Sequence, residues 1–410
     1  MLKRFVPVFY LITILFFSGI LSSQVKEDDF ELVESVPAET ILEQSAIPRT
    51  SDVWLSMINN AESTIDIETF YFANEKNEPL EEIMTALRNA AKRKVHIRVI
   101  VDSGFYSNND KSIDELNDIE NITIRKIPMG NIAGGVMHAK YFIVDNENLF
   151  LGSQNMDWRA LKHIHEIGVR VKNKKLAATF QDVFESDWNL CEVNRSGLTF
   201  NSVNRHVIAA DPLSLNSENY GKIVLYPAFS PPEINLSGLS SEEEELLKWI
   251  NIAGDSLLIQ MYSYSPKAKN EKNYYDKIDN ALREAASRNV KIKIIFPDWA
   301  IRDPATNFIK ELSKVNNIEV KFSSIPEYSG GFIPYSRVEH CKYFTVDNII
   351  SWISTSNWEW GYFYSSRNAT LIIENEKVNL QLCEVFNRSW NSPYSNFVDI
   401  NKEYKTVKRN

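Results

Sequence analysis

The sequence predicts an α/β protein made of two tandem, related halves. Similar segments recur in the same order roughly 200 residues later, as in LRNAAKRKVHIRVIVD at 87–102 and LREAASRNVKIKIIFPD at 282–298. Within each copy, strand-like alternation and helical spacing succeed one another, which is the pattern of an α/β unit. A solenoid repeats at a much shorter period, so this chain is one domain duplicated.

The first half opens with a predicted strand, helix and strand. TIDIETFYF at 64–72 is rich in β-branched and aromatic residues and predicts a strand. Residues 79–93 carry apolar side chains at helical spacing, and VHIRVIVD at 95–102 alternates like a strand. Elements in this order predict a crossover connection with parallel pairing of the two strands.

The remainder of the half predicts a hairpin and a closing helix. HAKYFIVD at 138–145 and NLFLGS at 148–153 are strand-like runs on either side of a turn, which is typical of a hairpin. LAATFQDVFESDWN at 176–189 predicts an amphipathic helix. In the second half, residues 240–250 carry four consecutive glutamates, which favour the first turn of a helix.

The predicted organisation has four parts. Residues 1–24 form a signal peptide or signal-anchor, 27–200 the first half, 201–221 a polar linker, and 222–400 the second half. The linker is predicted from its polar composition and its Asp-Pro pair, which favour a connection over a regular element.

The amino terminus predicts entry into the secretory pathway. Lys3 and Arg4 precede an apolar run over residues 5–21, and small polar residues follow. A cleaved signal would leave a secreted, lumenal, lysosomal or periplasmic protein, whereas an uncleaved signal-anchor would tether the body to a membrane. Five glycosylation sequons fit this route, and they start at Asn121, Asn194, Asn235, Asn368 and Asn387.

Composition argues against several other classes of protein. The net charge of −9 gives no support for a broadly basic surface that binds nucleic acid, although a phosphate site needs only local positive charge. Three cysteines do not make a disulfide scaffold, and a single bridge between Cys191 and Cys383 is the expectation in an oxidising compartment. The patterns of serine hydrolases, P-loop proteins and zinc proteases are missing from the sequence.

One short motif occurs in both halves at the same spacing. The first copy is His138-x-Lys140-x4-Asp145-x6-Gly152-Ser153-x-Asn155, and the second has His340, Lys342, Asp347, Ser354, Thr355 and Asn357 at the equivalent positions. Residues two apart on a strand project from one face, so each His and Lys are expected to point together. Both aspartates fall at turns outside that register and are expected to orient or support the site, while the return strand can approach it.

These residue types suit the chemistry of a phosphodiester. Lys supplies a positive charge and Asn a neutral donor for the phosphate oxygens. One imidazole can attack phosphorus, and a second can protonate the leaving oxygen and then activate water. Because the two roles need different protonation states, two halves folded face to face would complete one site. The near-symmetric copies do not themselves assign the attacking histidine.

Two further histidines, His163 and His165, are spaced like metal ligands on a strand. Since no third ligand follows at ligand spacing, the sequence predicts a surface strand here and no metal site.

The doubled motif is similar to the signature of the phospholipase D superfamily, and residues 138–155 match that signature in full. The resemblance implies two α-β-α sandwich halves with mixed sheets, related by a pseudo-twofold axis and sharing one active site. It also implies a covalent phosphohistidine intermediate and no metal or other cofactor.

Carried over by position, the resemblance makes His138 the nucleophile and His340 the general acid. Glu166 matches a carboxylate that orients a catalytic histidine. The catalytic set is then His138, Lys140, Asp145, His340, Lys342 and Asp347, and the substrate-binding set is Ser153, Asn155, Thr355 and Asn357. Two positions depart from the pattern: Ser354 stands where Gly is usual, and Asn368 stands where a second orienting carboxylate is expected.

The finer likeness is to the lysosomal five-prime exonuclease branch of the superfamily. It rests on segments such as FELVESVP at 30–37 and LYPAFSPP at 225–232 and implies single-stranded DNA or RNA as the substrate. Aromatic side chains could stack the bases, although most are expected in the core. Two alternatives remain open: a phospholipase D or transphosphatidylase on phospholipid headgroups, and a catalytically weak binding protein of the same fold. The oligomeric state is not predicted.

Overall fold

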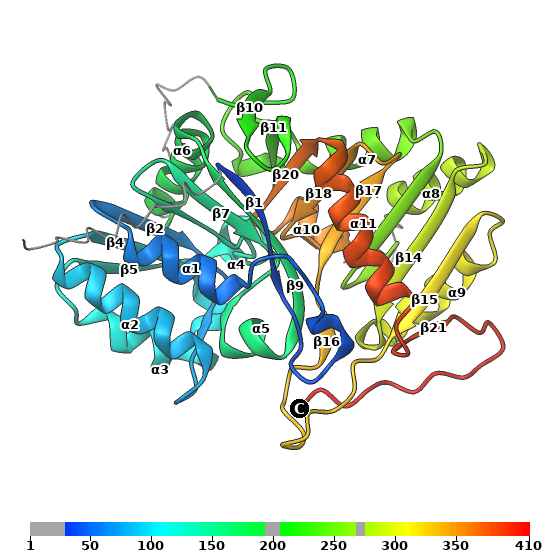
Figure 1. Ribbon diagram of the computed structural model, residues 1–410, viewed down its shortest axis with the longest axis horizontal. Coiled ribbons are helices and arrows are strands. Elements are labelled where there is room, and N and C mark those ends of the chain that lie inside the picture. The colour runs from blue at the N-terminus through cyan, green and yellow to red at the C-terminus, as the bar shows by residue number, and fades with distance from the viewer. Residues whose placement is uncertain (1–28, 193–205, 268–274) are drawn as a thin grey trace, which may run out of the picture.

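The computed structural model describes residues 29–192, 206–267 and 275–410. These residues form two α/β halves that lie side by side (Figure 1). The predicted signal segment 1–24 and the sequon at Asn194 lie outside the described residues. Among the helices of the described ranges, none combines the length and the apolar character that crossing a bilayer requires.

The first half runs from β1 to α6. Its elements are β1 (Phe30–Ser35), η1 (Ile41–Glu43), α1 (Thr50–Asn59), β2 (Thr64–Glu68), β3 (Phe72–Ala73), α2 (Pro79–Lys92), β4 (His96–Asp102), α3 (Ser103–Asn117), β5 (Ile122–Ile127), α4 (Met129–Ile132), β6 (Tyr141–Val144), β7 (Asn148–Gly152), β8 (Met156–Asp157), α5 (Trp158–Lys162), β9 (Ile164–Lys172) and α6 (Lys174–Leu190).

The second half runs from β10 to β21. Its elements are β10 (Leu213–Ser217), β11 (Gly221–Ser230), η2 (Pro232–Ile234), α7 (Glu242–Ile252), β12 (Ser256–Met261), β13 (Tyr264–Ser265), α8 (Lys277–Ser287), β14 (Lys291–Pro297), η3 (Asp298–Ala300), α9 (Ala305–Ser313), β15 (Ile318–Ser323), β16 (Val338–Glu339), β17 (Lys342–Val346), β18 (Ile350–Ser354), β19 (Trp358–Glu359), α10 (Trp360–Tyr364), β20 (Asn368–Glu374), α11 (Glu376–Trp390) and β21 (Ser395–Phe397).

Each half is built on a mixed sheet, and the second sheet repeats the strand order of the first with β10 and β21 added at its edges. In the first sheet the order is β1-β9-β7-β6-β2-β4-β5, and in the second it is β10-β11-β20-β18-β17-β12-β14-β15-β21. Strands β2, β4 and β5 are parallel, as are β12, β14 and β15, and each set is joined by crossover helices. The predicted α/β fold of two tandem halves is confirmed, including the parallel pairing across α2.

The predicted hairpin is β6 and β7 in the first half and β17 and β18 in the second. Both hairpins turn through two residues with positive φ, which matches the twist of the flanking strands. In the first turn Asp145 and Asn146 each have a φ of 53°, and in the second Asp347 and Asn348 have 51° and 59°. Asp and Asn tolerate this backbone conformation better than most residues, so the sequence at the turn fixes the register of the strands around each motif.

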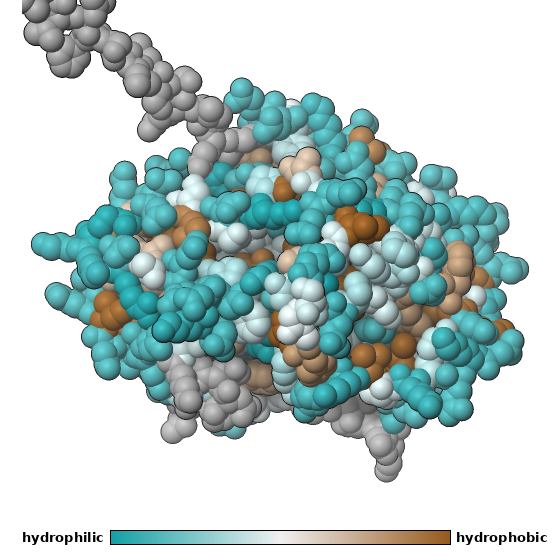
Figure 2. Space-filling view, turned by 60° about the horizontal axis from the view of Figure 1, so that its bottom comes forward, coloured by the Kyte–Doolittle hydropathy of each residue, from teal (hydrophilic) through white to brown (hydrophobic). Residues whose placement is uncertain are grey.

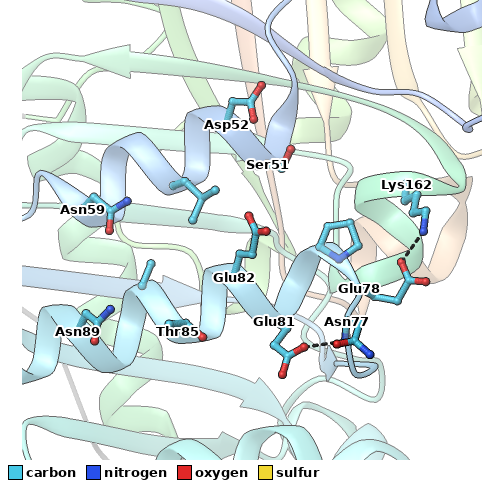
Figure 3. A pocket seen from close by; sticks show the side chains of 13 residues that line it. Ser51, Asp52, Asn59, Asn77, Glu78, Glu81, Glu82, Thr85, Asn89 and Lys162 are labelled. Carbon is cyan, nitrogen blue, oxygen red and sulfur yellow. Dashed lines mark hydrogen bonds and ion pairs between the residues drawn. The ribbon is translucent and has the colours of Figure 1, made fainter.

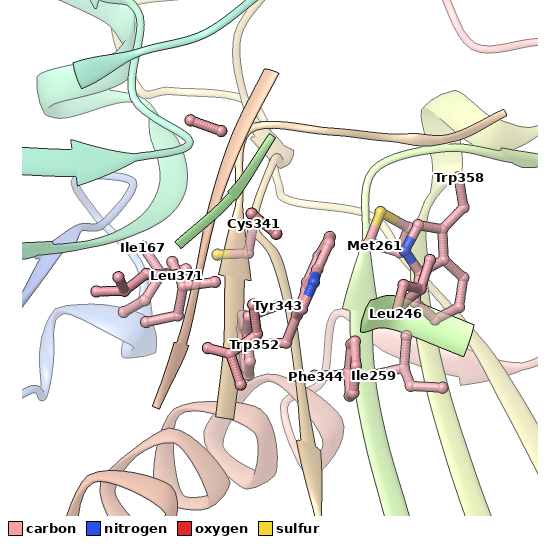
Figure 4. Packing of buried hydrophobic residues seen from close by; sticks show 14 of the residues in the cluster. Ile167, Leu246, Ile259, Met261, Cys341, Tyr343, Phe344, Trp352, Trp358 and Leu371 are labelled. Carbon is pink, nitrogen blue, oxygen red and sulfur yellow. The ribbon is translucent and has the colours of Figure 1, made fainter. Parts of the chain in front are cut away.

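One hydrophobic core continues across the junction between the halves. Ile167 of β9 and Leu371 of β20 belong to the same buried cluster as Tyr343 of β17 and Trp352 of β18 (Figure 4). The two halves therefore share buried surface in addition to their polar contacts, and their relative position is fixed by packing.

Polar contacts between the halves surround His165, which the sequence placed on a surface strand. That prediction is wrong: His165 is fully buried on β9, where its Nε2 lies 2.8 Å from Glu34 and its Nδ1 meets Glu339 of β16. Burial opposes a charge here, but Cys341 and Glu339 raise the pKa of His165 well above its usual range. The protonated ring bridges a carboxylate of each half, because β16 pairs with β9 in parallel.

The structure differs from the sequence-based expectations at two further places. Residues 213–217, inside the predicted linker 201–221, form the edge strand β10 of the second sheet. The expected bridge between Cys191 and Cys383 is not formed, since both are free thiols, and Cys383 Sγ lies 3.3 Å from Asn379 Oδ1. Each of these thiols packs within its own half.

Candidate active site

The two motif histidines lie at the contact between the halves, where the backbone of each histidine hydrogen-bonds to the opposite half. The backbone N–H of His138 donates to the carbonyl of Arg367 (2.9 Å), and that of His340 donates to the carbonyl of His165 (2.8 Å). Arg367 immediately precedes Asn368 of β20, and His165 precedes Glu166 of β9. Each histidine is therefore held against a polar side chain from the opposite half. The resemblance gave Glu166 an orienting role, but it did not say that the histidine it orients belongs to the other half.

His138 has its tautomer fixed by Asn368. The Asn368 Nδ2 donates to the carbonyls of Tyr362 (2.9 Å) and Ser366 (3.3 Å), so its Oδ1 must be the atom that faces His138 Nδ1 at 3.0 Å. An acceptor at that position requires a proton on Nδ1 and leaves the lone pair on Nε2. Burial, with Lys140 and Lys342, lowers the pKa of His138 well below its usual range. The ring is neutral and suited to attack.

His340 is paired instead with a carboxylate. Its Nδ1 lies 2.9 Å from both oxygens of Glu166, which is fully buried. Burial raises the pKa of Glu166 to about 8, and burial together with Lys342 and Lys140 lowers the pKa of His340. Below about pH 8, Glu166 and His340 therefore share an extra proton, beyond that of a neutral imidazole beside an ionised carboxylate. A general acid needs such a proton to donate.

The departure at Asn368 therefore creates a difference in role between the two histidines. A carboxyl partner can share a proton with the ring, whereas an amide oxygen only orients a neutral ring. Asn368 is also fully buried, so the sequon that starts there does not offer an exposed glycan acceptor.

The two motif lysines lie beneath the histidines. Lys140 Nζ donates to the carbonyl of His138 (2.6 Å), and Lys342 Nζ donates to that of His340 (2.7 Å). Burial lowers the pKa of Lys342 to about 7, and burial with Lys342 lowers that of Lys140 well below its usual range. Burial disfavours the charged form of both lysines, and a phosphodiester anion bound beside them would favour that form again.

Asp145 and Asp347 lie away from the histidines, so their assignment to the catalytic set is corrected. Asp145 accepts from the backbone N–H groups of Glu62, Ser63 and Thr64 at 2.7–2.9 Å. Asp347 does the same at the start of β12 in the second half, at 2.8 Å. A strand rises about 3.3 Å per residue, which puts each aspartate, five residues on, roughly 16 Å along the strand from its lysine. Both carboxylates fix the hairpin to the neighbouring strand.

The residues on the return strands divide into two kinds. Asn155 and Asn357 line the cavity that contains both histidines, as predicted, and each side-chain oxygen has no hydrogen-bond partner among the described residues. Ser153 and Thr355 are wholly buried, and their hydroxyls accept from the backbone N–H groups of Ile167 and Ala369 at 3.1 Å. Their predicted contact with substrate is therefore corrected to a supporting one.

Ser354, which stands where the family pattern has Gly, hydrogen-bonds to a buried glutamate. In the first half, a Cβ on Gly152 would lie 2.8 Å from the Cα of Gly168, so no side chain fits there. In the second half, Ser354 and Thr370 occupy these positions, and each hydroxyl donates to Glu242 Oε1 at 2.6 Å. Glu242 begins α7, the helix predicted from its acidic first turn, and its burial lets β18 and β20 keep their register.

A cavity of about 640 Å³ opens above both histidines, and half of its lining residues are Phe, Tyr or Trp. Phe70 meets His138 edge-on with centroids 5.4 Å apart, and its counterpart in the repeat, Tyr262, meets His340 at 4.6 Å. Two cations approach the same rings, since Lys140 lies 5.4 Å from Phe70 and Lys342 lies 5.0 Å from Tyr262. The remaining aromatic residues of the lining are Tyr71, Phe105, Trp299, Tyr335 and Tyr362.

Sequence reasoning assigned the aromatic residues to the core as a group and did not single out these rings. The usable signal was their place in the repeat, because Phe70 and Tyr262 each stand six residues after the first residue of equivalent strands, β2 and β12.

A second hollow of about 730 Å³ lies between α1 and α2 and contains neither histidine (Figure 3). Its charged lining residues are mainly carboxylates, including Asp52, Glu81 and Glu82, and its one cation among the described residues, Lys162, is paired with Glu78 at 2.8 Å. This surface would repel a phosphodiester, so the cavity between the halves is the candidate site.

Comparison with known proteins agrees with this geometry. The sequence profile described as cardiolipin synthase, PLD-like domain, matches residues 54–188 and 246–390, one stretch in each half. The chain belongs to the phospholipase D superfamily. Each matched stretch contains one histidine and one lysine of the site, so this phospholipase D-like enzyme is a phosphodiesterase whose single site draws on both repeats.

Several relatives within the superfamily span nearly the whole chain. It is 30% identical to the 5′-3′ exonuclease PLD3 of Xenopus laevis, over 92% of this chain and 83% of that protein. It is 29% identical to phospholipase D Y of Dictyostelium discoideum (94% and 97% covered) and 31% identical to the virion nicking-joining enzyme of vaccinia virus (84% of each). These phospholipase D relatives share a reaction class and differ in what they act on.

A solved structure supports the fold. The phosphatidylserine synthase of Haemophilus influenzae superposes with a TM-score of 0.59 at 13% identity, covering 85% of each chain. At this identity the likeness extends to the arrangement of the two phospholipase D-like halves alone.

The pKa shifts at the site predict a pH profile for this phosphodiesterase. On a small diester, kcat/KM is expected to hold at mildly acidic pH, because His138 stays neutral there, and to fall between about pH 7 and 8. Over that range Lys342 loses its charge and the Glu166–His340 pair loses its proton.

The shape of the profile can be checked with one conservative variant. In Lys342→Arg the side chain keeps its charge at alkaline pH. The fall in kcat/KM that begins near pH 7 should therefore shift to higher pH, even if the maximal rate of the variant is lower. A rate that rises through pH 8 in the unmodified protein would contradict the assignment.

Proposed function

We propose that the protein is an exonuclease that removes nucleotides from the five-prime end of single-stranded DNA or RNA. The observation that carries the proposal is the lining of the 640 Å³ cavity, where seven aromatic residues accompany the two histidines. The two motif lysines are buried next to these histidines, where each donates to a histidine carbonyl. Rings beside a phosphate site are the usual way to hold a single strand, since every base offers a π-face. The likeness to the exonuclease PLD3 of Xenopus laevis, over most of both chains, supports the same substrate.

The proposed reaction proceeds through a phosphohistidine. His138 Nε2 attacks phosphorus as the bond to the leaving oxygen breaks, and that oxygen takes the proton held by the His340–Glu166 pair. Water then attacks phosphorus and gives its proton to His340. This attack breaks the P–N bond and restores the lone pair of His138. Lys140, Lys342 and the amides of Asn155 and Asn357 hold the phosphate oxygens while charge develops on them.

The competing substrate is a phospholipid. Aromatic rings also hold quaternary ammonium groups, and phospholipase D Y of Dictyostelium discoideum is another relative of similar identity. Phosphatidylcholine is therefore the control substrate in the test.

The deciding assay offers the purified protein three substrates with and without a chelator. These are a linear oligothymidylate with a free five-prime hydroxyl, a circular single strand, and phosphatidylcholine vesicles. Stepwise shortening of the linear strand from its five-prime end, with the circle intact, is the expected result. Release of choline alone would overturn the proposal, and cleavage of the circle would replace it with an endonuclease. Loss of all activity in chelator would contradict a site that relies on His and Lys.

A further inference from the structure

The segment 398–410 leaves the second sheet and runs to the mouth of the cavity. Its start is held by Val398, whose N–H donates to Val320 of β15 (3.0 Å), and its middle by the Tyr404 ring against Phe322. Its end is held by Arg409, whose carbonyl accepts from the N–H of Tyr335 (2.7 Å). Figure 1 shows this red trace crossing the lower edge of the molecule toward the junction of the halves.

The end of this segment touches two residues of the cavity lining. The guanidinium of Arg409 lies over the ring of Trp299, 5.1 Å from its centroid, and also donates to the Trp299 carbonyl. Trp299 and Tyr335 both line the cavity, with their rings 6.4 Å apart. The Tyr335 residue is 49% exposed, although its backbone is held by the hydrogen bond to Arg409. The rim thus places a cation and an exposed ring together.

The cations around the mouth differ in whether they are already paired. Arg159 is bound by Asp157 at 2.7 Å and Arg302 by Glu359 at 2.6 Å. Lys408 and Arg409 make no ion pair with a carboxylate of the described residues, and Lys408 instead lies 4.4 Å from the ring of Phe332, which is 42% exposed. Neither cation is thus held in a direct ion pair within the described ranges, although Arg409 lies near the half-buried Asp298. Burial raises the pKa of Asp298 to about 6, and Arg409 opposes that rise.

The net negative charge of the protein makes the cations at the cavity rim important for binding a polyanion. With a net charge of −9 the protein repels a polyanion at long range, so a strand must be held by local cations. The face turned forward in Figure 2 is mostly hydrophilic, with separate hydrophobic patches among the polar side chains. Cations interleaved with exposed rings are the arrangement that proteins use for single strands.

We propose that Lys408, Arg409 and Tyr335 form a subsite for the part of a single strand that extends beyond the scissile linkage. The two cations bind successive phosphates, and the Tyr335 ring stacks one base. This inference rests on the proposed nuclease function and adds to it a reason for the enzyme to favour strands longer than a dinucleotide.

The test compares substrates of two lengths. In Lys408→Ala/Arg409→Ala, kcat/KM for an oligothymidylate of about twelve nucleotides is expected to fall about tenfold at low salt, while that for the dinucleotide changes less than about twofold. The slope of log(kcat/KM) against log[salt] should become shallower by about 1.4, or about 0.7 for each lost phosphate contact. Tyr335→Ala should lower the preference for the long strand without altering the salt slope.

The matched control is Lys92→Ala/Lys174→Ala, which removes the same charge from exposed positions on α2 and α6. It should leave the length preference unchanged. An equal loss on both lengths in the rim variant, or no loss, overturns the subsite, and a gain in activity would show that the segment occludes the cavity. If the unmodified protein cleaves neither oligonucleotide but does cleave bis(4-nitrophenyl) phosphate, the nuclease function itself fails.

Discussion

Replacing His138 with Asn is expected to lower kcat by about 10⁴-fold or more, on every diester tested. The amide keeps a polar group beside Asn368, but it has no lone pair that can attack phosphorus and form the intermediate. Because no later step occurs without that intermediate, the loss should not depend on the leaving group. Steady-state kinetics on an oligonucleotide and on a 4-nitrophenyl diester measure it.

Two controls separate loss of the nucleophile from loss of the fold. His96→Asn makes the same change at an exposed histidine at the start of β4 and should retain full activity. Thermal unfolding of the His138 variant should follow that of the unmodified protein, since the site is held mainly by backbone pairing between the halves. A residual rate within about tenfold of normal would rule out His138 as the attacking group.

Replacing His340 with Asn is expected to produce a loss that depends on the leaving group. The sugar oxygen of a nucleoside is a poor leaving group unless it takes up a proton as it leaves, so kcat on an oligonucleotide should fall by about 10³-fold. The first step should be much less impaired with 4-nitrophenolate, which leaves without a proton. Water attack then lacks its base, so the phosphohistidine should accumulate and nitrophenolate should appear as a burst.

The adduct in the His340 variant should be labile to acid and stable to alkali, as a P–N bond requires, and mass spectrometry should place it on His138. An adduct that forms in the His138 variant instead would reverse the two assigned roles. Equal losses on both leaving groups with no burst would remove His340 from proton transfer. The physical basis of the asymmetry is the partner of each ring, a carboxylate for His340 and an amide for His138.

The local patterns of the sequence predicted the main elements well. Strands, crossover helix and hairpin were read from residue types and period, because hydrophobic spacing and turn residues act over a few positions. The duplication identified the site as well, since His138 with Lys140 and His340 with Lys342 stood out only when the halves were compared. Asn155 and Asn357 followed from the same spacing and do line the cavity.

What the sequence left open depended on contacts between the halves. Adjacent residues on a strand point to opposite faces, so His165 and Glu166 enter different environments: one bridges Glu34 and Glu339, and the other orients His340. Local spacing did not show that β9 and β20 would each supply the partner of the other half's histidine. It also gave no sign that residues 408–409 would reach Trp299.

The sequence by itself determined two copies of a phosphate-binding motif and the α/β frame that carries them. The tertiary structure decided which histidine is kept neutral and which shares a proton with Glu166. The physical reason is that a pKa depends on burial and on charges within a few ångströms, and those neighbours come from β strands about 200 residues apart in the chain.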